Sequence, residues 1–503
     1  MATPEPVNAH PHIPQSAVAL PKVETHIEGL DTVLHGGLPA GRTTLIWGGP
    51  GCGKTILALE CLYRSALAGE PSILVAFEEP VGKVRQNTLT LGWDLAPLEA
   101  AGKFLLIDGV PDPAGILSGD FNLHALLAII GGQAQRLGTR RLALDAVDAL
   151  TSLLPDPGRE RAELSALHHW LRDQQLTTVL TMKIAQDSAF PARYAFLDYL
   201  VDCVIHLDQR SALQVSTRRL QVLKYRGSGF HRNEYPYIIA EDGLHLLPVS
   251  SVALVQRSLG ETVSSGNGAL DALLGGGYRR GTCLLIPGAP GTGKTTLASV
   301  VAQAAAARGE RVLFLAFEES AETIVSSMLS PGIDLQPALQ GDTLRFLTAM
   351  PEATGVEEHL FHVLRAMEAF SPQLLVVDAL SSSLRMGSEQ AAFDYDLRLL
   401  TACKERGITC LFTSQLVRGE PEAAVAGLGG ANLASLVDTL VLLRFVERQG
   451  TLHRTLLVWK ARGMAHSPAC HEFRITDHGI EVLGVYDGDC SKLPGNASAP
   501  PHE

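Results

Sequence analysis

Two glycine-rich stretches of the sequence each end in a lysine followed by a threonine. The first reads GGPGCGKT and the second GAPGTGKT, and the positions of their lysines, 54 and 294, differ by 240. The pattern G-x-x-x-x-G-K-[ST] is typical of a loop whose backbone N–H groups surround phosphate oxygens, with glycine where a Cβ atom would block that approach. The sequence therefore predicts two phosphate-binding loops.

Each loop supplies a set of candidate ligand contacts. The lysines would reach the β and γ phosphates of a nucleotide, the two threonine hydroxyls would bind Mg²⁺, and the helix that follows would point its positive end at the phosphates. The predicted contacts are Gly48, Gly49, Pro50, Gly51, Cys52, Gly53, Lys54 and Thr55 in the first loop, and Gly288, Ala289, Pro290, Gly291, Thr292, Gly293, Lys294 and Thr295 in the second.

Carboxylates recur at fixed distances from the loops. Asp145 and Asp378 each end an apolar run, which would bring them to the sheet edge where such folds bind ligands. There they would hold a water molecule of the Mg²⁺ ion, and a helix cap or turn carboxylate is the alternative. Asp148, three residues after Asp145, is interpreted as a cap.

Two glutamate pairs, Glu78–Glu79 and Glu318–Glu319, follow the strands ILVAF and LFLAF. A single pair of this kind would be interpreted as solvated. Because both pairs stand at the same distance from their loops, they are predicted as catalytic, with the general-base role assigned to the first glutamate of each pair. Glu318 is also a candidate Mg²⁺ ligand.

Basic residues recur late in each half of the chain, as Lys224 with Arg226 and as Lys460 with Arg462. Alternating basic residues could form a solvated strand face. A cation donated across a subunit boundary would instead stabilise the charge that develops on the transferred phosphoryl group. The second interpretation requires a ring of subunits, and these four residues are predicted as nucleotide contacts.

The repeated motifs occur in the same order in both halves, which indicates an internal duplication. In each half, short Val/Ile/Leu-rich runs alternate with helical patterns, which predicts an α/β fold of two tandem P-loop domains with mostly parallel sheets covered on both faces. The expected organisation is a disordered arm at 1–20, a first domain at 21–248, a linker at 249–262, a second domain at 263–485 and a disordered tail at 486–503.

The composition limits the classes of partner. The formal net charge of −12 argues against a protein that binds nucleic acid through phosphate neutralisation. Eight cysteines without a C-x-x-C pair indicate neither a zinc site nor a disulfide scaffold, and they favour a reduced cytoplasm. No signal peptide and no apolar stretch of membrane-spanning length is recognised, so a cytoplasmic protein without membrane contact is expected.

The tandem motifs resemble the KaiC family of circadian clock ATPases in the RecA superfamily. The resemblance runs from about Glu24 to Val485 and includes GDFNLHAL, ARYAFLDYLVDCVIHL, EYPYIIAEDGLHLLP and VDTLVLL. It implies RecA-like domains in a double-ring homohexamer that binds ATP with Mg²⁺ between subunits. It also implies hydrolysis in the first ring, assisted by Glu78, and autokinase and phosphatase activity in the second, where Glu318 would activate the acceptor hydroxyl.

Three departures from the family pattern qualify this resemblance. Where the family has adjacent Ser and Thr phosphoacceptors, this sequence has Ala434 and Ser435, so Ser435 is the one predicted phosphosite. Ala146 and Ala379 replace a serine that relatives commonly carry after the strand-end aspartate. The short tail lacks the segment on which a KaiA-type activator acts, so a KaiB-type or signalling partner is expected instead.

Two other functions compete with this interpretation. A RecA-type recombinase or helicase subunit would act on DNA, but the acidic charge and the lack of basic, aromatic strand-binding loops argue against it. A nucleotide-gated scaffold would use hydrolysis only to reset the binding of a partner. The favoured function is an ATPase and Ser/Thr autokinase that serves as a signalling or timing hub.

Overall fold

The computed structural model describes residues 20–109, 123–151, 156–184, 194–212, 215–246, 260–350, 355–416 and 436–488. The chain divides into two compact units, residues 1–210 with 217–248 and residues 249–503 with the short segment 211–216. Most of the expected arm, linker and tail lies outside the described residues, and their boundaries stay predictions.

The first unit is built on a nine-stranded sheet with the order β11–β10–β9–β8–β3–β7–β6–β4–β5. In chain order its strands are β3 (Thr43–Gly48), β4 (Ser72–Ala76), β5 (Phe104–Asp108), β6 (Arg141–Asp145), β7 (Thr177–Lys183), β8 (Cys203–Ala212), β9 (Val215–Tyr225), β10 (Glu234–Ala240) and β11 (Gly243–Leu246). The strands from β8 to β5 pair in parallel, whereas β9, β10 and β11 pair antiparallel. A separate two-stranded ribbon pairs β1 (Lys22–Val23) with β2 (Leu38–Pro39).

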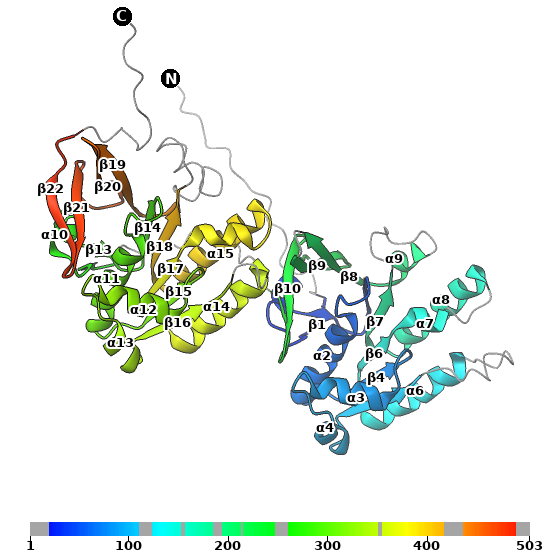
Figure 1. Ribbon diagram of the computed structural model, residues 1–503. Helices are drawn as coiled ribbons and strands as arrows, with labels where there is room; N and C mark the ends of the chain where they lie inside the picture. Colours follow the sequence, from blue (N-terminus) through cyan, green and yellow to red (C-terminus); the bar gives the residue numbers. More distant parts are fainter. Residues whose placement is uncertain are drawn as a thin grey trace, which may run out of the picture. The chain divides into compact units, whose positions relative to one another are not determined.

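Helices cover both faces of this sheet (Figure 1). One apolar core contains residues of α1 (Leu30–Val33), α2 (Lys54–Leu67), α3 (Val81–Leu89) and α4 (Ala96–Ala100). The other contains residues of α6 (Leu123–Leu137), α7 (Val147–Thr151), α8 (Pro157–Asp173) and α9 (Leu197–Leu200). Because β3 has a helical layer on both sides, all six of its residues are buried, including two threonines.

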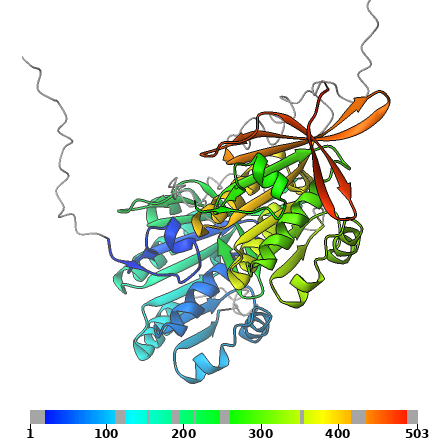
Figure 2. The same ribbon diagram turned by 90° about the vertical axis from the view of Figure 1, so that its left-hand side faces the viewer.

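The second unit repeats this topology with the strand order β16–β15–β17–β18–β14–β19–β20–β21–β22. Its strands are β14 (Cys283–Gly288), β15 (Val312–Ala316), β16 (Leu344–Thr348), β17 (Leu374–Asp378), β18 (Thr409–Gln415), β19 (Thr439–Arg448), β20 (Thr451–Ala461), β21 (Cys470–Thr476) and β22 (Gly479–Val485), with a separate ribbon of β12 (Thr262–Val263) and β13 (Tyr278–Arg279). Figure 2 shows its antiparallel strands, coloured orange to red, at one end of the sheet.

The helices of the second unit also form two layers. One core contains residues of α10 (Gly268–Leu273), α11 (Lys294–Ala307) and α12 (Ala321–Leu329), with α13 (Gln336–Gln340) packed against it. The other contains residues of α14 (Val356–Phe370), the 3₁₀ helix η2 (Leu380–Arg385) and α15 (Glu389–Arg406). The predicted α/β class with two tandem, mostly parallel sheets is confirmed. In the part of the chain that the structure describes, no helix has the length and apolar character needed to cross a membrane.

Candidate nucleotide sites

The first predicted phosphate loop connects β3 to α2 at the carboxyl edge of the sheet. Gly53 has a φ of 83°, and a Cβ atom there would lie 2.6 Å from Ile239 Cδ1. A Cβ atom on Gly48 would lie 2.1 Å from the carbonyl oxygen of Leu207. The chain therefore needs glycine at these two points to turn directly from the buried strand into the helix, whose first N–H groups face the loop.

Lys54 stands at the centre of the first site. Its Nζ donates a 2.7 Å hydrogen bond to the carbonyl oxygen of Gly49. Burial lowers the pKa of Lys54, and the negative charges of Asp148, Asp145 and Glu78 act in the opposite direction. The fold thus gathers the predicted lysine, strand-end aspartate and first glutamate at one edge of one sheet.

Asp145 is tied to the loop by Thr55, whose Oγ1 donates a 3.1 Å hydrogen bond to Asp145 Oδ1. The same carboxylate oxygen accepts a hydrogen bond from the hydroxyl of Thr181 on β7. Burial raises the pKa of Asp145, whereas these two hydroxyl donors lower it. A hydroxyl and a carboxylate in contact are hard oxygen donors of the kind that Mg²⁺ prefers.

The second site repeats the contact of the loop lysine with a carbonyl group and that of a strand threonine with the strand-end aspartate. Lys294 Nζ donates to the carbonyl oxygen of Ala289 at 3.0 Å, and burial lowers the pKa of Lys294 while Asp378 and Glu318 counteract that effect. Asp378 accepts a hydrogen bond from Thr413 on β18, which occupies the place of Thr181. Gly293 begins α11 with a φ of 100°, as Gly53 begins α2. The peptide bond after the strand-end aspartate is cis in both units.

The two predicted bases have different surroundings. Desolvation raises the pKa of Glu78, and the neighbouring carboxylates Asp148 and Asp145 raise it further. Glu318 instead accepts a 3.1 Å hydrogen bond from Ser382 Oγ and pairs with Arg385 Nη2 at 3.2 Å. The first base therefore has two neighbouring carboxylates that raise its pKa and two lysines, Lys183 and Lys54, that lower it, whereas the second contacts a hydroxyl and a cation.

The second glutamate of the first pair has a different environment from the first. Glu79 pairs with Lys83 at 3.1 Å and accepts a 3.0 Å hydrogen bond from Asn87, both on the surface of α3. Glu319 is exposed, and so is Glu318. The assignment of the first glutamate of each pair as the base stays a prediction.

Asp148 and Ser381 occupy equivalent places after the strand-end aspartates. Asp148 lies in the first turn of α7, and its Oδ1 accepts a 2.9 Å hydrogen bond from the backbone N–H of Lys183. Ser381 Oγ accepts a 3.0 Å bond from the backbone N–H of Gln415. The sequence predicts Asp148 as a cap. In the structure, the group that donates to it is the backbone N–H at the end of the neighbouring strand β7.

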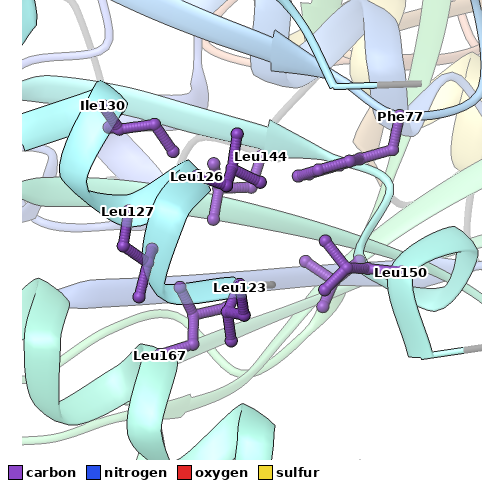
Figure 3. Close-up of a pocket in the computed structure, with 9 residues that line it drawn as sticks. Phe77, Leu123, Leu126, Leu127, Ile130, Leu144, Leu150 and Leu167 are labelled. Carbon is purple, nitrogen blue, oxygen red and sulfur yellow. The ribbon is translucent and has the colours of Figure 1, made fainter. Parts of the chain in front are cut away.

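A small apolar cavity lies behind the first site (Figure 3). Its walls come from β6, from helices α6, α7 and α8, and from the residue before Glu78; they are formed by Phe77, Leu123, Leu126, Leu127, Ile130, Leu144, Val147, Leu150 and Leu167. The lining is entirely hydrocarbon, so the cavity offers no polar partner to a ligand.

The predicted basic residues lie at one end of the central strands, and the loop of the same unit lies at the other end. The hydrogen bond of 2.8 Å from Arg226 N to Asp202 O places the end of β9 beside the start of β8, next to Thr43 at the start of β3. Thr43 and Gly48 are five positions apart along β3, which is roughly 16 Å at about 3.3 Å per residue. Lys224 and Arg226 are therefore not brought together with Lys54.

The side chains at this end of the strands bind backbone carbonyl groups around α9. Lys224 Nζ donates to the carbonyl oxygens of Asp198 and Val201, and Arg226 Nη2 donates to that of Tyr199 at 2.6 Å. In the second unit, Lys460 pairs in register with Leu440 near the start of β19 and donates to Val437 O at 2.7 Å.

Arg462 lies 3.8 Å from Asp438, again at the strand end opposite the loop. The two basic residues thus lie at equivalent strand positions in both units, although Arg226 donates to a carbonyl group and Arg462 pairs with a carboxylate.

Several site residues are not predicted from the sequence. Thr181 and Thr413 hold the strand-end aspartates, and Ser382 and Arg385 hold Glu318. The two threonines stand at matching places in the duplicated strands TTVLTMK and TCLFTSQ, so aligning the halves at every strand would have found them. Ser382 and Arg385 have no such counterpart in the first half. The predicted phosphosite Ser435 lies outside the described residues.

The residues predicted to contact Mg²⁺ lie beside the two loops. Among the described residues there is no group of three or more His, Cys, Asp and Glu side chains that could bind a metal ion. Thr55 with Asp145, and Thr295 with Asp378, would each contribute oxygen ligands or hold bound water, and phosphate oxygens would complete the shell. Glu318 stays a predicted ligand, and its carboxylate contacts Ser382 and Arg385.

Comparison with known proteins agrees with this geometry. The family model described as "ATPase: KaiC" matches residues 23–251 and again residues 263–485. The chain belongs to the KaiC ATPase family. Several KaiC proteins are similar to this chain along most of their length. The circadian clock protein KaiC2 of Synechocystis sp. is 38% identical over 95% of this chain and 84% of its own length. The circadian clock oscillator protein KaiC of Synechococcus elongatus is 34% identical over 92% of this chain and 89% of its own.

Proposed function

We propose that this KaiC-family ATPase assembles into a hexameric ring, hydrolyses ATP at its first loop and phosphorylates its own Ser/Thr side chains at its second. The observation that carries the proposal is the convergence, at each loop, of one lysine with the charges of a strand-end aspartate and a glutamate. That set of groups can bind phosphates, hold Mg²⁺ and accept a proton from an attacking hydroxyl.

In the first unit, each of these residues has a separate role. Lys54 and the backbone N–H groups of the loop bind the phosphates of ATP, while Thr55 and Asp145 orient the Mg²⁺ coordination shell. Glu78 accepts the proton of the attacking water. Mg²⁺ supplies charge neutralisation on the β and γ phosphates.

The ring is supported by the position of the basic residues. Lys224 and Lys460 cannot serve the loop of their own unit, because they lie at the opposite end of its central strands. Leu223 and Trp459, which precede them, are 46% and 44% exposed, and Tyr199 beside Lys224 is 78% exposed. Large apolar side chains around a cation are typical of a surface that another protein covers, and a second copy of this chain is the proposed occupant.

Autokinase activity in the second unit is supported by Glu318, which lies close enough to Lys294 to affect its pKa. Ser435 is the acceptor that the family pattern indicates. The names of the relatives connect this type of protein with a circadian clock. Since Ala434 replaces one acceptor of the family pattern, we propose a role in timekeeping or signalling with a KaiB-type or signalling partner.

One labelling experiment tests both activities. The full chain is incubated with ATP labelled at the γ phosphate and Mg²⁺, and released phosphate and protein-bound label are measured together. We expect both products, with release reduced in Lys54→Ala and label lost in Lys294→Ala. Release without label would overturn the autokinase and leave the ATPase. Native mass spectrometry with ATP tests the ring, and a monomer or dimer as the largest species would overturn it.

The competing functions give different results in the same assays. A nucleotide-gated scaffold would bind its partner differently in ATP and ADP, with the ATP-bound form persisting in Glu78→Gln. A DNA-dependent ATPase would be stimulated by single-stranded DNA, whereas we expect an unchanged rate.

A further inference from the structure

Ser382 lies on η2, four residues after Asp378, and contacts the predicted base of the second site. Its Oγ donates a 3.1 Å hydrogen bond to Glu318 Oε1. Arg385, one turn further along η2, donates from Nη2 to the same carboxylate oxygen at 3.2 Å and to Ser382 Oγ at 3.4 Å. A hydroxyl, a carboxylate and a guanidinium group therefore meet at one point.

This arrangement is the one that activates a hydroxyl nucleophile. Such a nucleophile lies within roughly 2.6–3.2 Å of its base, and a third group orients the base. Glu318 also lies close enough to the phosphate-binding Lys294 for its charge to raise the pKa of that lysine. We propose that Ser382 is a phosphoacceptor that receives the γ-phosphoryl group of ATP bound to the second loop of the same chain. The proposal rests on the autokinase activity proposed above and assigns it an acceptor within the site itself.

The transfer balances without a further reactant. Glu318 takes the hydroxyl proton as Ser382 Oγ forms a bond to the γ phosphorus. The bond between that phosphorus and the β,γ-bridging oxygen breaks, and ADP leaves with the electron pair. The products are phosphoserine, ADP and a protonated Glu318, which returns its proton to solvent.

Ser382 is buried, with 3% of its surface exposed, but the side chains that contact its hydroxyl are themselves partly exposed. The two side chains that contact its hydroxyl, Glu318 and Arg385, are themselves 48% and 46% exposed. Rotation of these two surface side chains would open the hydroxyl to the nucleotide. Once formed, the phosphoserine would have a guanidinium group within reach, and bidentate pairing of arginine with phosphate is a strong charge-assisted contact.

The first unit provides an internal comparison. Counting from the strand-end aspartate, Ala149 stands where the second unit has Ser382. The first site therefore has a base but no hydroxyl at this position, so water remains the acceptor there. The duplication thus places a side-chain nucleophile in the second site alone.

The test maps phosphorylation at residue level in the full chain. Wild-type protein is incubated with Mg²⁺ and γ-labelled ATP, and phosphopeptides are identified by mass spectrometry. We expect phosphoserine at position 382, none there in Glu318→Gln or Lys294→Ala, and phosphothreonine in Ser382→Thr. Ser383→Ala is the matched control, because the side chain of this neighbour on η2 faces Asp396, and it should keep the label at 382.

The outcomes separate the acceptor from the autokinase. Label on other residues only, with position 382 unmodified, would overturn the acceptor and leave the autokinase standing. A chain that releases phosphate but takes up no label would overturn both. Mixing Lys294→Ala with Ser382→Ala chains tests the same-chain route, since only transfer between chains could then label Ser382; label at that position would overturn the same-chain assignment.

Discussion

Thr55 Oγ1 lies 3.1 Å from Asp145 Oδ1, so the last residue of the first phosphate loop is hydrogen-bonded to the end of β6. These two residues are 90 positions apart in the sequence. They meet because β3 and β6 both pair with β7 in parallel and end at the same edge of the sheet. The contact joins the phosphate-binding loop to the carboxylate expected to hold the Mg²⁺ shell.

Asp145→Asn tests that role. The neutral amide keeps the shape of the side chain but loses the charge, so the Mg²⁺ concentration for half-maximal ATP hydrolysis should rise about 10–100-fold, as for other residues that orient metal ligands. The measurement is a Mg²⁺ titration of phosphate release in a Lys294→Ala background, which isolates the first site. Asp173→Asn, on the exposed surface of α8, is the control. An unchanged Mg²⁺ requirement in Asp145→Asn would remove Asp145 from the site.

The environment of Glu78 predicts the acid limb of the pH–rate profile. A general base must be ionised, and the pKa of Glu78 is raised by desolvation and by Asp148 and Asp145, so activity should fall at a higher pH than for an ordinary glutamate. Asp148→Asn removes one like charge but keeps an oxygen acceptor for Lys183 N–H. The acid limb of first-site hydrolysis should therefore move to lower pH. A limb that stays in place or moves to higher pH would contradict the assignment of Glu78 as the base.

Much of this arrangement could be predicted from the sequence because it depends on local patterns. The apolar strands, the glycine loops and the aspartates that end strands are each specified within a few residues, and duplication repeats each signal. The partners of Glu318 could not be predicted, because Arg385 reaches it from an element 67 positions away through a side-chain rotamer. Glu60, a buried carboxylate inside the apolar face of α2, was likewise overlooked.

Mixing two inactive variants tests the ring. Lys224→Ala should lower first-site hydrolysis by roughly 10³-fold if the cation acts on a neighbour's nucleotide. A mixture with Lys54→Ala should regain activity, since an intact loop of one chain then meets an intact Lys224 of the next. Random mixing would restore about one quarter of the sites. If Lys224 only held the carbonyl groups near α9, the mixture would be no more active than its components, which is the outcome that rejects the shared site.

Glu60 connects the helix that follows the first loop to the last hairpin of the first unit. Its side chain is fully buried, accepts a 2.8 Å hydrogen bond from the backbone N–H of Leu244 and pairs with Arg64. A Cβ atom on Gly243 would lie 2.4 Å from Glu60 Oε1, so the hairpin turn closes directly on this carboxylate. Removing the carboxylate would leave the Leu244 N–H buried without its acceptor.

Glu60→Ala should therefore destabilise this hairpin by about 1–3 kcal/mol, the usual cost of an unsatisfied buried donor. At about 1.4 kcal/mol per factor of ten, amide hydrogen exchange in β11 should accelerate roughly 5–150-fold. Glu60→Gln keeps an oxygen acceptor in the same place and should show a smaller acceleration. Exchange in β22, the equivalent strand of the second unit, serves as the reference and should not change. Equal exchange in β11 for wild type and Glu60→Ala would show that α2 and the hairpin are held together by apolar packing alone.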